Sequence, residues 1–326
     1  MLPNFSYIRV KSLQEAVEAS QGGGTHILAG GTDLLGCLRD QIFSADQIVS
    51  ITRLSALKGI SQTSDGGLRI GALTTITEIA ESPVIKQLFP GLARAASEVA
   101  SPALRNRGTV GGNLCQKPRC WYYRGEFRCL RKGGDTCYAL GGENQYHGIF
   151  GSDYKCCIVH PSDIAPMLMA LGASVKVTGP RGSRNVPIEN FFVLPKDDVR
   201  RETVLGSGEI VEEILVPKPP DGLRTSYRKV RVRLAWDFAV VGLALALVFK
   251  GDKVELGSMV LGGTAPIPWR SKSAEHVIIG HRLDAKISLK AAETSVKDAQ
   301  PLEHNAYKVS LLRAIVEEEL NKLAQG

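Results

Sequence analysis

Six of the seven cysteines of this 326-residue chain lie between residues 115 and 157, and this cysteine block constrains the fold more than any other feature. The block is polar and rich in glycine, so it has too few apolar residues for a core of its own. Ordering each residue costs roughly 1–2 kcal/mol of backbone entropy. Something must therefore tie the block down, and metal–thiolate bonds would do so.

The spacing of the cysteines favours a metal cluster over a single ion. The candidate ligands are Cys120, Cys129, Cys137 and Cys156, which are separated by 8, 7 and 18 residues. Cys157 is adjacent to the last of them. Zinc usually takes ligand pairs two to four residues apart, whereas a [4Fe–4S] cubane is wider and accepts thiolates from loops spread along the chain. A disulfide frame fits poorly, because the chain is large and its cysteine count is odd.

Free buried thiols are the alternative interpretation of these cysteines, since a free cysteine often behaves as a small buried hydrophobe. We expect Cys37 and Cys115 to be of that kind. Chemistry alone does not separate Cys156 from Cys157 as the fourth ligand.

Composition places the chain among globular proteins of two domains, with 44% hydrophobic and 22% charged residues. The net charge of +7 is locally dense only at residues 224–233, which an anionic cofactor or an acidic partner explains as well as DNA does, so we predict no nucleic-acid partner. The longest apolar run, residues 238–249, is 12 residues long, and a membrane span needs roughly 20. No secretory signal is visible in residues 1–11, which predicts a cytoplasmic protein unless a partner subunit carries an export signal for a periplasmic assembly.

The order of elements along the chain predicts an α+β fold. Short apolar strands are expected at residues 5–10, 26–29 and 68–73, and capping boxes at Ser12/Glu15 and Thr75/Glu78 each predict the start of a helix. Residues 239–249 and 254–261, joined by a polar turn, predict a hairpin, and a last helix is expected at about 305–324. The proline-rich residues 217–220 mark the boundary between a domain of residues 1–219, which contains the inserted block 115–157, and a domain of residues 220–326.

Two glycine segments are suited to a pyrophosphate. Residues 28–34 contain Gly30 and Gly31, and residues 108–113 contain Gly111 and Gly112. Glycine lets the backbone approach phosphate oxygens and direct N–H groups at them. Neither segment is G-x-G-x-x-G or a P-loop, so nicotinamide dinucleotide and ATP are not indicated. Each glycine pair taken alone is also typical of an ordinary turn.

Taken together, residues 29–34, residues 101–102 with 105–114, and residues 160–163 resemble, in order and spacing, the medium FAD subunit of the xanthine dehydrogenase and aldehyde oxidoreductase family of molybdenum hydroxylases. Residues 227–231 are similar to the start of that family's C-terminal domain, so the resemblance covers nearly the whole chain. It implies a two-subdomain FAD-binding domain of the vanillyl-alcohol-oxidase and p-cresol-methylhydroxylase type. A smaller α/β C-terminal domain of the CO dehydrogenase flavoprotein type, an antiparallel sheet with helices, would follow.

The inserted cysteine block resembles the [4Fe–4S] loop of a subgroup that includes bacterial aldehyde oxidoreductases and the β subunit of 4-hydroxybenzoyl-CoA reductase. Most members of the family lack this insertion. Cys156 lies four residues before His160, the offset of the aldehyde-oxidising subgroup, so the resemblance favours Cys156 over Cys157 beside Cys120, Cys129 and Cys137.

The resemblance also implies FAD-binding residues. Those of the first loop would wrap the pyrophosphate: His26, Ile27, Leu28, Ala29, Gly30, Gly31, Thr32, Asp33 and Leu34. Those of the second loop would be Thr109, Val110, Gly111, Gly112 and Asn113. Asp163 would hold a ribose or the flavin edge, Val211 would contact the cofactor through its backbone, and Lys229 would lie near the isoalloxazine. The alternatives are a helix N-cap for Asp163 and a solvated strand lysine for Lys229.

The implied function is electron transfer, without a catalytic residue in this chain. A molybdopterin-binding large subunit would hydroxylate the substrate, a small [2Fe–2S] subunit would pass electrons on, and FAD in this chain would deliver them to an external acceptor. An aldehyde oxidoreductase is favoured, and a 4-hydroxybenzoyl-CoA reductase or xanthine dehydrogenase subunit is the alternative. A stand-alone flavoenzyme with its own substrate pocket and a zinc-stabilised interaction module remain as other classes.

Non-covalent binding of FAD is expected, because neither glycine loop has a His or Cys placed to attach the flavin ring. Acid precipitation should therefore release all of the flavin into the supernatant, where its absorbance is measured. Yellow colour remaining in the protein pellet would contradict this expectation.

Overall fold

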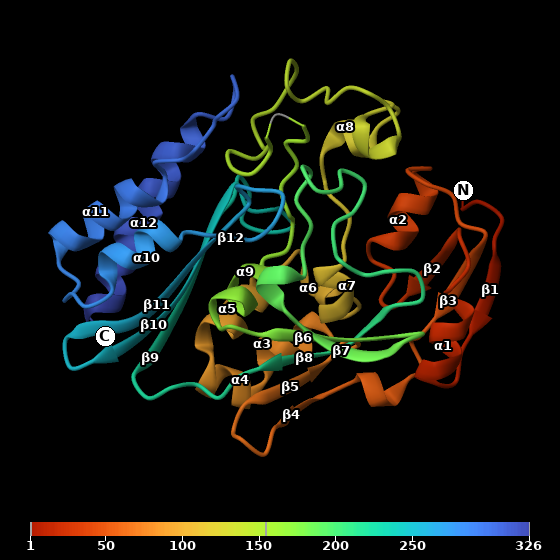
Figure 1. Cartoon of the computed structure of the whole chain (residues 1–326), viewed down its shortest axis with the longest axis horizontal. Coiled ribbons are helices and arrows are strands. Elements are labelled where there is room, and N and C mark those ends of the chain that lie inside the picture. Colours follow the sequence, from red (N-terminus) through yellow and green to blue (C-terminus); the bar gives the residue numbers. More distant parts are fainter. Residues whose placement is uncertain (1, 154, 326) are drawn as a thin grey trace.

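The computed structural model describes residues 2–153 and 155–325. Residue 1 of the first predicted domain, residue 326 of the second and residue 154 of the cysteine block lie outside the described residues. Three sheets follow one another across the molecule, with the N-terminal sheet at one side and the C-terminal sheet with its helices at the other (Figure 1). The cysteine block lies along the edge between them, at the top of Figure 1.

The first sheet is parallel and small. Its strands are β1 (Ser6–Arg9), β2 (Thr25–Leu28) and β3 (Gln47–Ser50), in the order β1-β3-β2, and the helices α1 (Leu13–Ala19) and α2 (Leu34–Arg39) follow β1 and β2. The predicted start of α1 is confirmed, since Ser12 Oγ accepts from Glu15 N at 3.1 Å. The Glu15 carboxylate accepts from Lys11 N at 2.7 Å instead of from Ser12, so the expected capping box is shifted by one residue.

The second sheet is antiparallel and has the order β4-β5-β8-β6-β7. Its strands are β4 (Ile60–Gln62), β5 (Leu68–Gly71), β6 (Ser174–Gly179), β7 (Gly182–Pro187) and β8 (Ile210–Val216). The connections contain α3 (Ile76–Glu81), α4 (Pro83–Leu88), α5 (Pro90–Ser97), α6 (Pro102–Arg105), α7 (Val110–Leu114), α9 (Ile164–Ala170) and the 3-10 turns η1 (Ser55–Leu57) and η3 (Ile188–Asn190). The capping box of Thr75 and Glu78 is complete. Prolines at the first position of α4 and α5 divide residues 76–97 into three helices.

The third sheet is the predicted hairpin extended on both sides. Its strands β9 (Leu223–Val230), β10 (Val241–Lys250), β11 (Lys253–Gly262) and β12 (Trp269–Arg270) are antiparallel in the order β12-β11-β10-β9. Along β10, Leu243, Leu245 and Leu247 enter a buried cluster with the helices α10 (Lys272–Ile278), α11 (Ala285–Ser295) and α12 (Tyr307–Gln325). Ala244 and Ala246 enter the cluster formed with α5 and α9. The sheet therefore lies between two helical layers, and its strands alternate between them.

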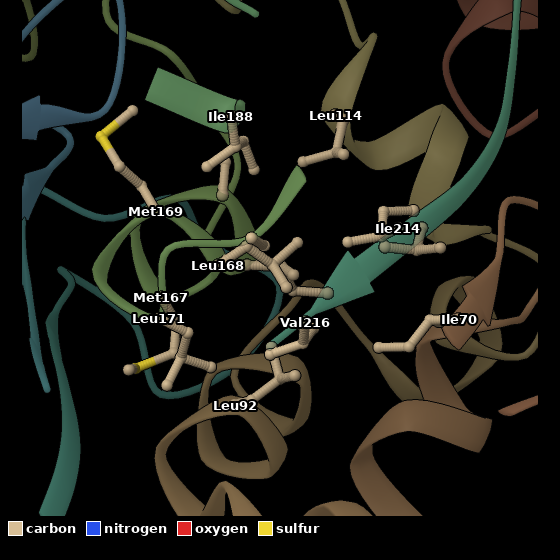
Figure 2. Close-up of a cluster of buried hydrophobic side chains, with 14 of the residues drawn as sticks. Ile70, Leu92, Leu114, Met167, Leu168, Met169, Leu171, Ile188, Ile214 and Val216 are labelled. Atoms are coloured by element: carbon tan, nitrogen blue, oxygen red, sulfur yellow. The ribbon is translucent and has the colours of Figure 1, made fainter. Parts of the chain in front are cut away.

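The largest core cluster lies between the second sheet and the helices α5 and α9. Figure 2 shows its side chains arriving from segments far apart in the sequence, with Leu92 from α5, Leu168 from α9 and Ile214 from β8. Tyr227 and Ala244 of the third sheet belong to the same cluster. The boundary predicted at residue 219 lies between β8 and β9, and the division into two domains there stays a prediction.

The described residues of the cysteine block contain little regular structure, only α8 (Trp121–Arg124) and η2 (Leu130–Lys132). Its buried Tyr123 and Cys129 pack with Cys37 and Ile42, in and just after α2. The block thus packs against α2 and the residues that follow it. Among the described residues, no helix is long and apolar enough to cross a membrane.

Candidate functional site

The two glycine loops meet backbone to backbone. A Cβ added to Gly30 would lie 1.9 Å from the carbonyl oxygen of Arg107, and Gly31 has a φ of +76°, which side chains other than glycine rarely adopt. A Cβ on Gly111 would lie 3.0 Å from the carbonyl oxygen of Ala72. The contact between the loops therefore depends on glycine at position 30 above all.

The second loop uses several of its amides within the protein. Val110 N donates to Thr74 O at 2.9 Å, Gly111 N donates to Ala72 O at 3.0 Å, and Gly112 N donates to Thr109 Oγ1 at 3.2 Å. The expectation that the N–H groups of this loop point at a ligand is therefore wrong for these three residues. Val110 and Gly111 are buried supports, while Thr109, Gly112 and Asn113 line the open space beside the loop.

Three adjoining cavities form one groove along the loops. The middle cavity, of about 230 Å³, is lined by Thr32, Asp33, Gly108, Thr109, Gly112, Asn113, Asp163 and residues 236–238, among others. It shares Thr109 with a cavity of about 250 Å³ beside Ala29, Gly30, Thr52 and Lys58. It shares Arg119, Pro161, Asp237 and Phe238 with a cavity of about 350 Å³ that reaches the cysteine block. The groove therefore extends from the end of β2 to the cysteines.

Asp163 is a buried carboxylate held by two side chains of β9. Tyr227 Oη donates to Asp163 Oδ1 at 2.7 Å, and Lys229 Nζ donates to Asp163 Oδ2 at 2.8 Å and to Glu98 O at 3.0 Å. Burial raises the pKa of Asp163, and the Lys229 ammonium opposes that rise. The lysine is 1% exposed, so the alternative of a solvated strand lysine is excluded. Asp163 stands at the N-cap position of α9 as the alternative had it, but its side chain makes no capping hydrogen bond, and Ser162 Oγ accepts from Ala165 N at 2.9 Å instead.

Asp33 connects the first glycine loop to the cysteine block. Its carboxylate pairs with Arg119 and Arg124, each at 2.8 Å, and accepts from Lys117 N at 2.8 Å. Arg124 also donates to Cys37 Sγ at 2.9 Å. The residue predicted for the FAD loop therefore fixes the position of the first turn of the block.

The remaining predicted contacts lie around the groove or behind it. His26 packs on Phe43 with ring centroids 4.8 Å apart, and its Nε2 is 3.2 Å from Ser44 O. The side chains of Ile27, Leu28 and Leu34 pack on hydrophobic clusters of the first subdomain. Val211 is buried in β8 and does not line the groove. Backbone contact from these residues stays a prediction, and of the first loop Ala29, Gly30, Thr32 and Asp33 line the groove.

The cysteines of the block converge. One small cavity of about 10 Å³, which has room for roughly one water, is lined by the four predicted ligands Cys120, Cys129, Cys137 and Cys156. Cys157, Arg131 and His147 line the same cavity. The neighbouring thiols of Cys156 and Cys157 lower the pKa of Cys137. Within residues 2–153 and 155–325, no three His, Cys, Asp or Glu side chains are arranged to hold a single metal ion.

Polar atoms around this cavity lack partners. Arg131 Nε and His147 Nδ1 are buried without a hydrogen-bond partner, although His147 Nε2 lies 3.2 Å from Cys120 Sγ. Burial lowers the pKa of His147 to about 4. Buried unpaired polar atoms are costly and uncommon, so they mark this cavity as a candidate ligand site.

Sequence reasoning missed three residues of the groove. Arg119 and Phe238 line both the middle cavity and the cavity that reaches the cysteine block, and the Arg119 guanidinium lies 5.2 Å from the centroid of the Phe238 ring. Tyr227 donates a hydrogen bond to Asp163. The position of Arg119 beside a predicted cysteine ligand was a usable signal. Phe238 offered none, because it stands at the start of an apolar run that reads as strand.

Comparisons with known proteins agree over the whole chain. A family model described as the FAD binding domain in molybdopterin dehydrogenase matches residues 3–219, and one described as the CO dehydrogenase flavoprotein C-terminal domain matches residues 225–323. These matches confirm the predicted fold class, an FAD-binding domain followed by a smaller domain with an antiparallel sheet.

Two curated relatives are named for aldehydes. The chain is 34% identical over 316 residues to the FAD-binding subunit of an aldehyde oxidoreductase of Escherichia coli K12, covering 95% of each chain. It is 31% identical to the medium chain of glyceraldehyde dehydrogenase of Sulfolobus acidocaldarius, covering 93% of this chain and 91% of the relative. A solved structure of carbon monoxide dehydrogenase from Hydrogenophaga pseudoflava superposes with a TM-score of 0.78 at 26% identity, over 98% of this chain and 97% of that one.

Replacing Gly30 by alanine is expected to lower the FAD content of the purified protein at least about tenfold, because the new Cβ would push the two loops apart. Gly36→Ala is the matched control, since a Cβ at that position in α2 meets nothing within 4 Å and alanine favours a helix. Flavin absorbance per protein measures both variants. Equal flavin content in Gly30→Ala and the unmodified protein would contradict this role of the loop contact.

Proposed function

Because this chain belongs to the FAD-binding medium subunits of the molybdenum hydroxylases, we propose that it transfers electrons in an aldehyde oxidoreductase complex, from molybdenum and iron–sulfur centres through FAD to an external acceptor. Two relatives named for aldehydes support the substrate class. The observation that carries the electron-transfer role is that Cys120 and His147 line both the cysteine cavity and the groove.

The groove runs from the glycine loops to the cysteine block and is lined by groups of the kind that bind FAD. The two glycine loops approach each other so closely that no side chain fits at position 30, which leaves backbone for a pyrophosphate. Thr32 and Thr109 offer hydroxyl groups there, and the buried pair of Asp163 and Lys229 offers charge at the side of β9. FAD supplies reversible uptake of electrons, and these residues orient it and adjust its potential.

The cysteine cavity supports a [4Fe–4S] cluster held by Cys120, Cys129, Cys137 and Cys156. Its donors are thiols, the ligands that iron–sulfur clusters take, and no carboxylate lines it. Arg131 is nearly buried at its wall and would offset the negative charge of a thiolate-bound cluster. The thiols must move outward from the present cavity to accept a cluster, and Cys157 would then be a packing neighbour.

We propose that the organic substrate reacts on another polypeptide. The partners would be a molybdopterin-binding large subunit and a small [2Fe–2S] subunit, since the relatives are named as subunits and medium chains. A cytoplasmic location stays a prediction. A subunit of a 4-hydroxybenzoyl-CoA reductase or a xanthine dehydrogenase is the second candidate, and the relatives named for xanthine dehydrogenase, at 27% identity, favour it less.

Iron analysis of single Cys→Ser variants, each purified as the complex, tests the assignment. Cys120→Ser, Cys129→Ser, Cys137→Ser and Cys156→Ser should each lose about one to four irons per complex, because each removes one of the four thiolates that hold the cluster. Cys157→Ser should retain them, and Cys115→Ser is the matched control from the same block.

Two outcomes would contradict the proposal in different ways. Unchanged iron in Cys156→Ser with loss in Cys157→Ser would show that the fourth ligand is wrongly assigned. Unchanged iron in all five variants would remove the cluster from this chain while leaving the FAD role in place.

A further inference from the structure

The start of α12 contacts the end of the cysteine block almost entirely through backbone carbonyls of the block. Lys308 Nζ donates to Tyr146 O at 3.0 Å and to His147 O at 2.9 Å. Asn305 Nδ2 is 3.2 Å from His147 O and 3.3 Å from Gly148 O. Side-chain donors on the C-terminal domain thus hold the main chain of three consecutive residues, and we call Asn305 and Lys308 the clamp.

Neighbouring residues add to the clamp on both sides. Tyr307 Oη donates to Gln145 O at 2.8 Å, and His304 N donates to Asn144 Oδ1 at 2.9 Å. Lys308 Nζ makes a third bond of 2.9 Å to Gly263 O, just after β11, and Gly263 lines the far cavity of the groove. The same ammonium therefore joins the block, the helix and the end of a core strand.

Lys308 is costly to bury, which argues that its position matters. The residue is 0% exposed, and among the described residues no carboxylate pairs with it. Burial lowers the pKa of its ammonium to about 7. An apolar side chain would fill the same space at a smaller desolvation cost, whereas three carbonyl acceptors in two separate segments of the chain define one geometry.

The residue held most firmly by the clamp is the one beside the cysteines. His147 O accepts from both Lys308 and Asn305, and the His147 ring lies 3.2 Å from Cys120 Sγ and 5.8 Å, centroid to centroid, from Trp121. Displacing the main chain at residue 147 would move a wall of the cysteine cavity and a wall of the groove together.

We propose that Asn305 and Lys308 are positioning residues that hold residues 144–148 so that His147 and Cys120 form the wall between the cysteine cavity and the groove. This inference rests on the proposed function only for the assignment of a [4Fe–4S] cluster to the cysteine cavity. The clamp itself is a contact between the C-terminal domain and the block, and it acts whether or not a metal is bound.

Hydrogen exchange of the purified complex, followed by mass spectrometry on peptides covering residues 144–149, tests the clamp. The amides of His147 and Gly148, which donate to Asn144 O and Cys157 O, report on it. In Lys308→Met and Asn305→Asp these amides should exchange about tenfold faster than in the unmodified complex, because the carbonyls lose their buried donors. Asn305→Asp keeps the oxygen that accepts from Leu302 N and replaces the donor group with an acceptor oxygen, which faces the carbonyls of His147 and Gly148.

Lys290→Met, on the exposed face of α11, is the matched control and should exchange as the unmodified complex does. Exchange in peptides that cover β4 to β8, expected to match the unmodified complex in all three variants, shows that the first domain remains folded. Unchanged exchange at residues 144–149 in both clamp variants would overturn the proposal.

Iron content is measured on the same samples, and loss of at least half of the cluster iron is expected in both clamp variants. If the unmodified complex shows no iron attributable to this chain, the cluster assignment fails and the exchange result still decides the clamp. If iron is present and falls in Lys308→Met without faster exchange, the positioning mechanism is wrong.

Discussion

The carboxylate of Asp33 is the contact on which the arrangement of the site depends. It lines the groove, yet its hydrogen-bonding capacity is taken by Lys117 N, Arg119 and Arg124 of the cysteine block. Charge-assisted hydrogen bonds of this kind are among the stronger polar contacts, and they are more effective when partly buried. A residue of the flavin loop therefore determines where the block begins, and with it where Cys120 lies.

Contacts from outside the block hold it at several points. Glu202 pairs with Lys117 at 2.5 Å and with Arg131, whose side chain is 2% exposed, and Tyr123 packs on α2. The C-terminal helix holds its last part through Lys308. The sequence led us to expect that metal–thiolate bonds would tie the block down. Protein contacts already provide a frame that brings five thiols to one cavity, and metal binding would add to it.

Local patterns predicted the elements well, and long-range contacts escaped prediction. The capping box at Thr75 and the hairpin around residues 250–253 depend on neighbours within a few positions, so sequence reports them directly. The buried pair of Asp163 and Lys229 joins residues 66 positions apart, and Lys308 reaches carbonyls about 160 positions away. Nothing near Lys229 or Lys308 in the sequence distinguishes a buried lysine from a solvated one. The amides of Val110 and Gly111 were likewise assigned to a ligand because their partners, Thr74 and Ala72, lie in another segment.

We propose that one chain holds FAD and a [4Fe–4S] cluster on two sides of a wall formed by Cys120 and His147. Native mass spectrometry of the purified complex, with this subunit released in the gas phase, tests it most directly because it assigns the metal to this chain and not to a partner. The account predicts a released chain that carries the added mass of four irons and four sulfides. A released chain that retains FAD but carries no iron, or a single zinc ion, would contradict it.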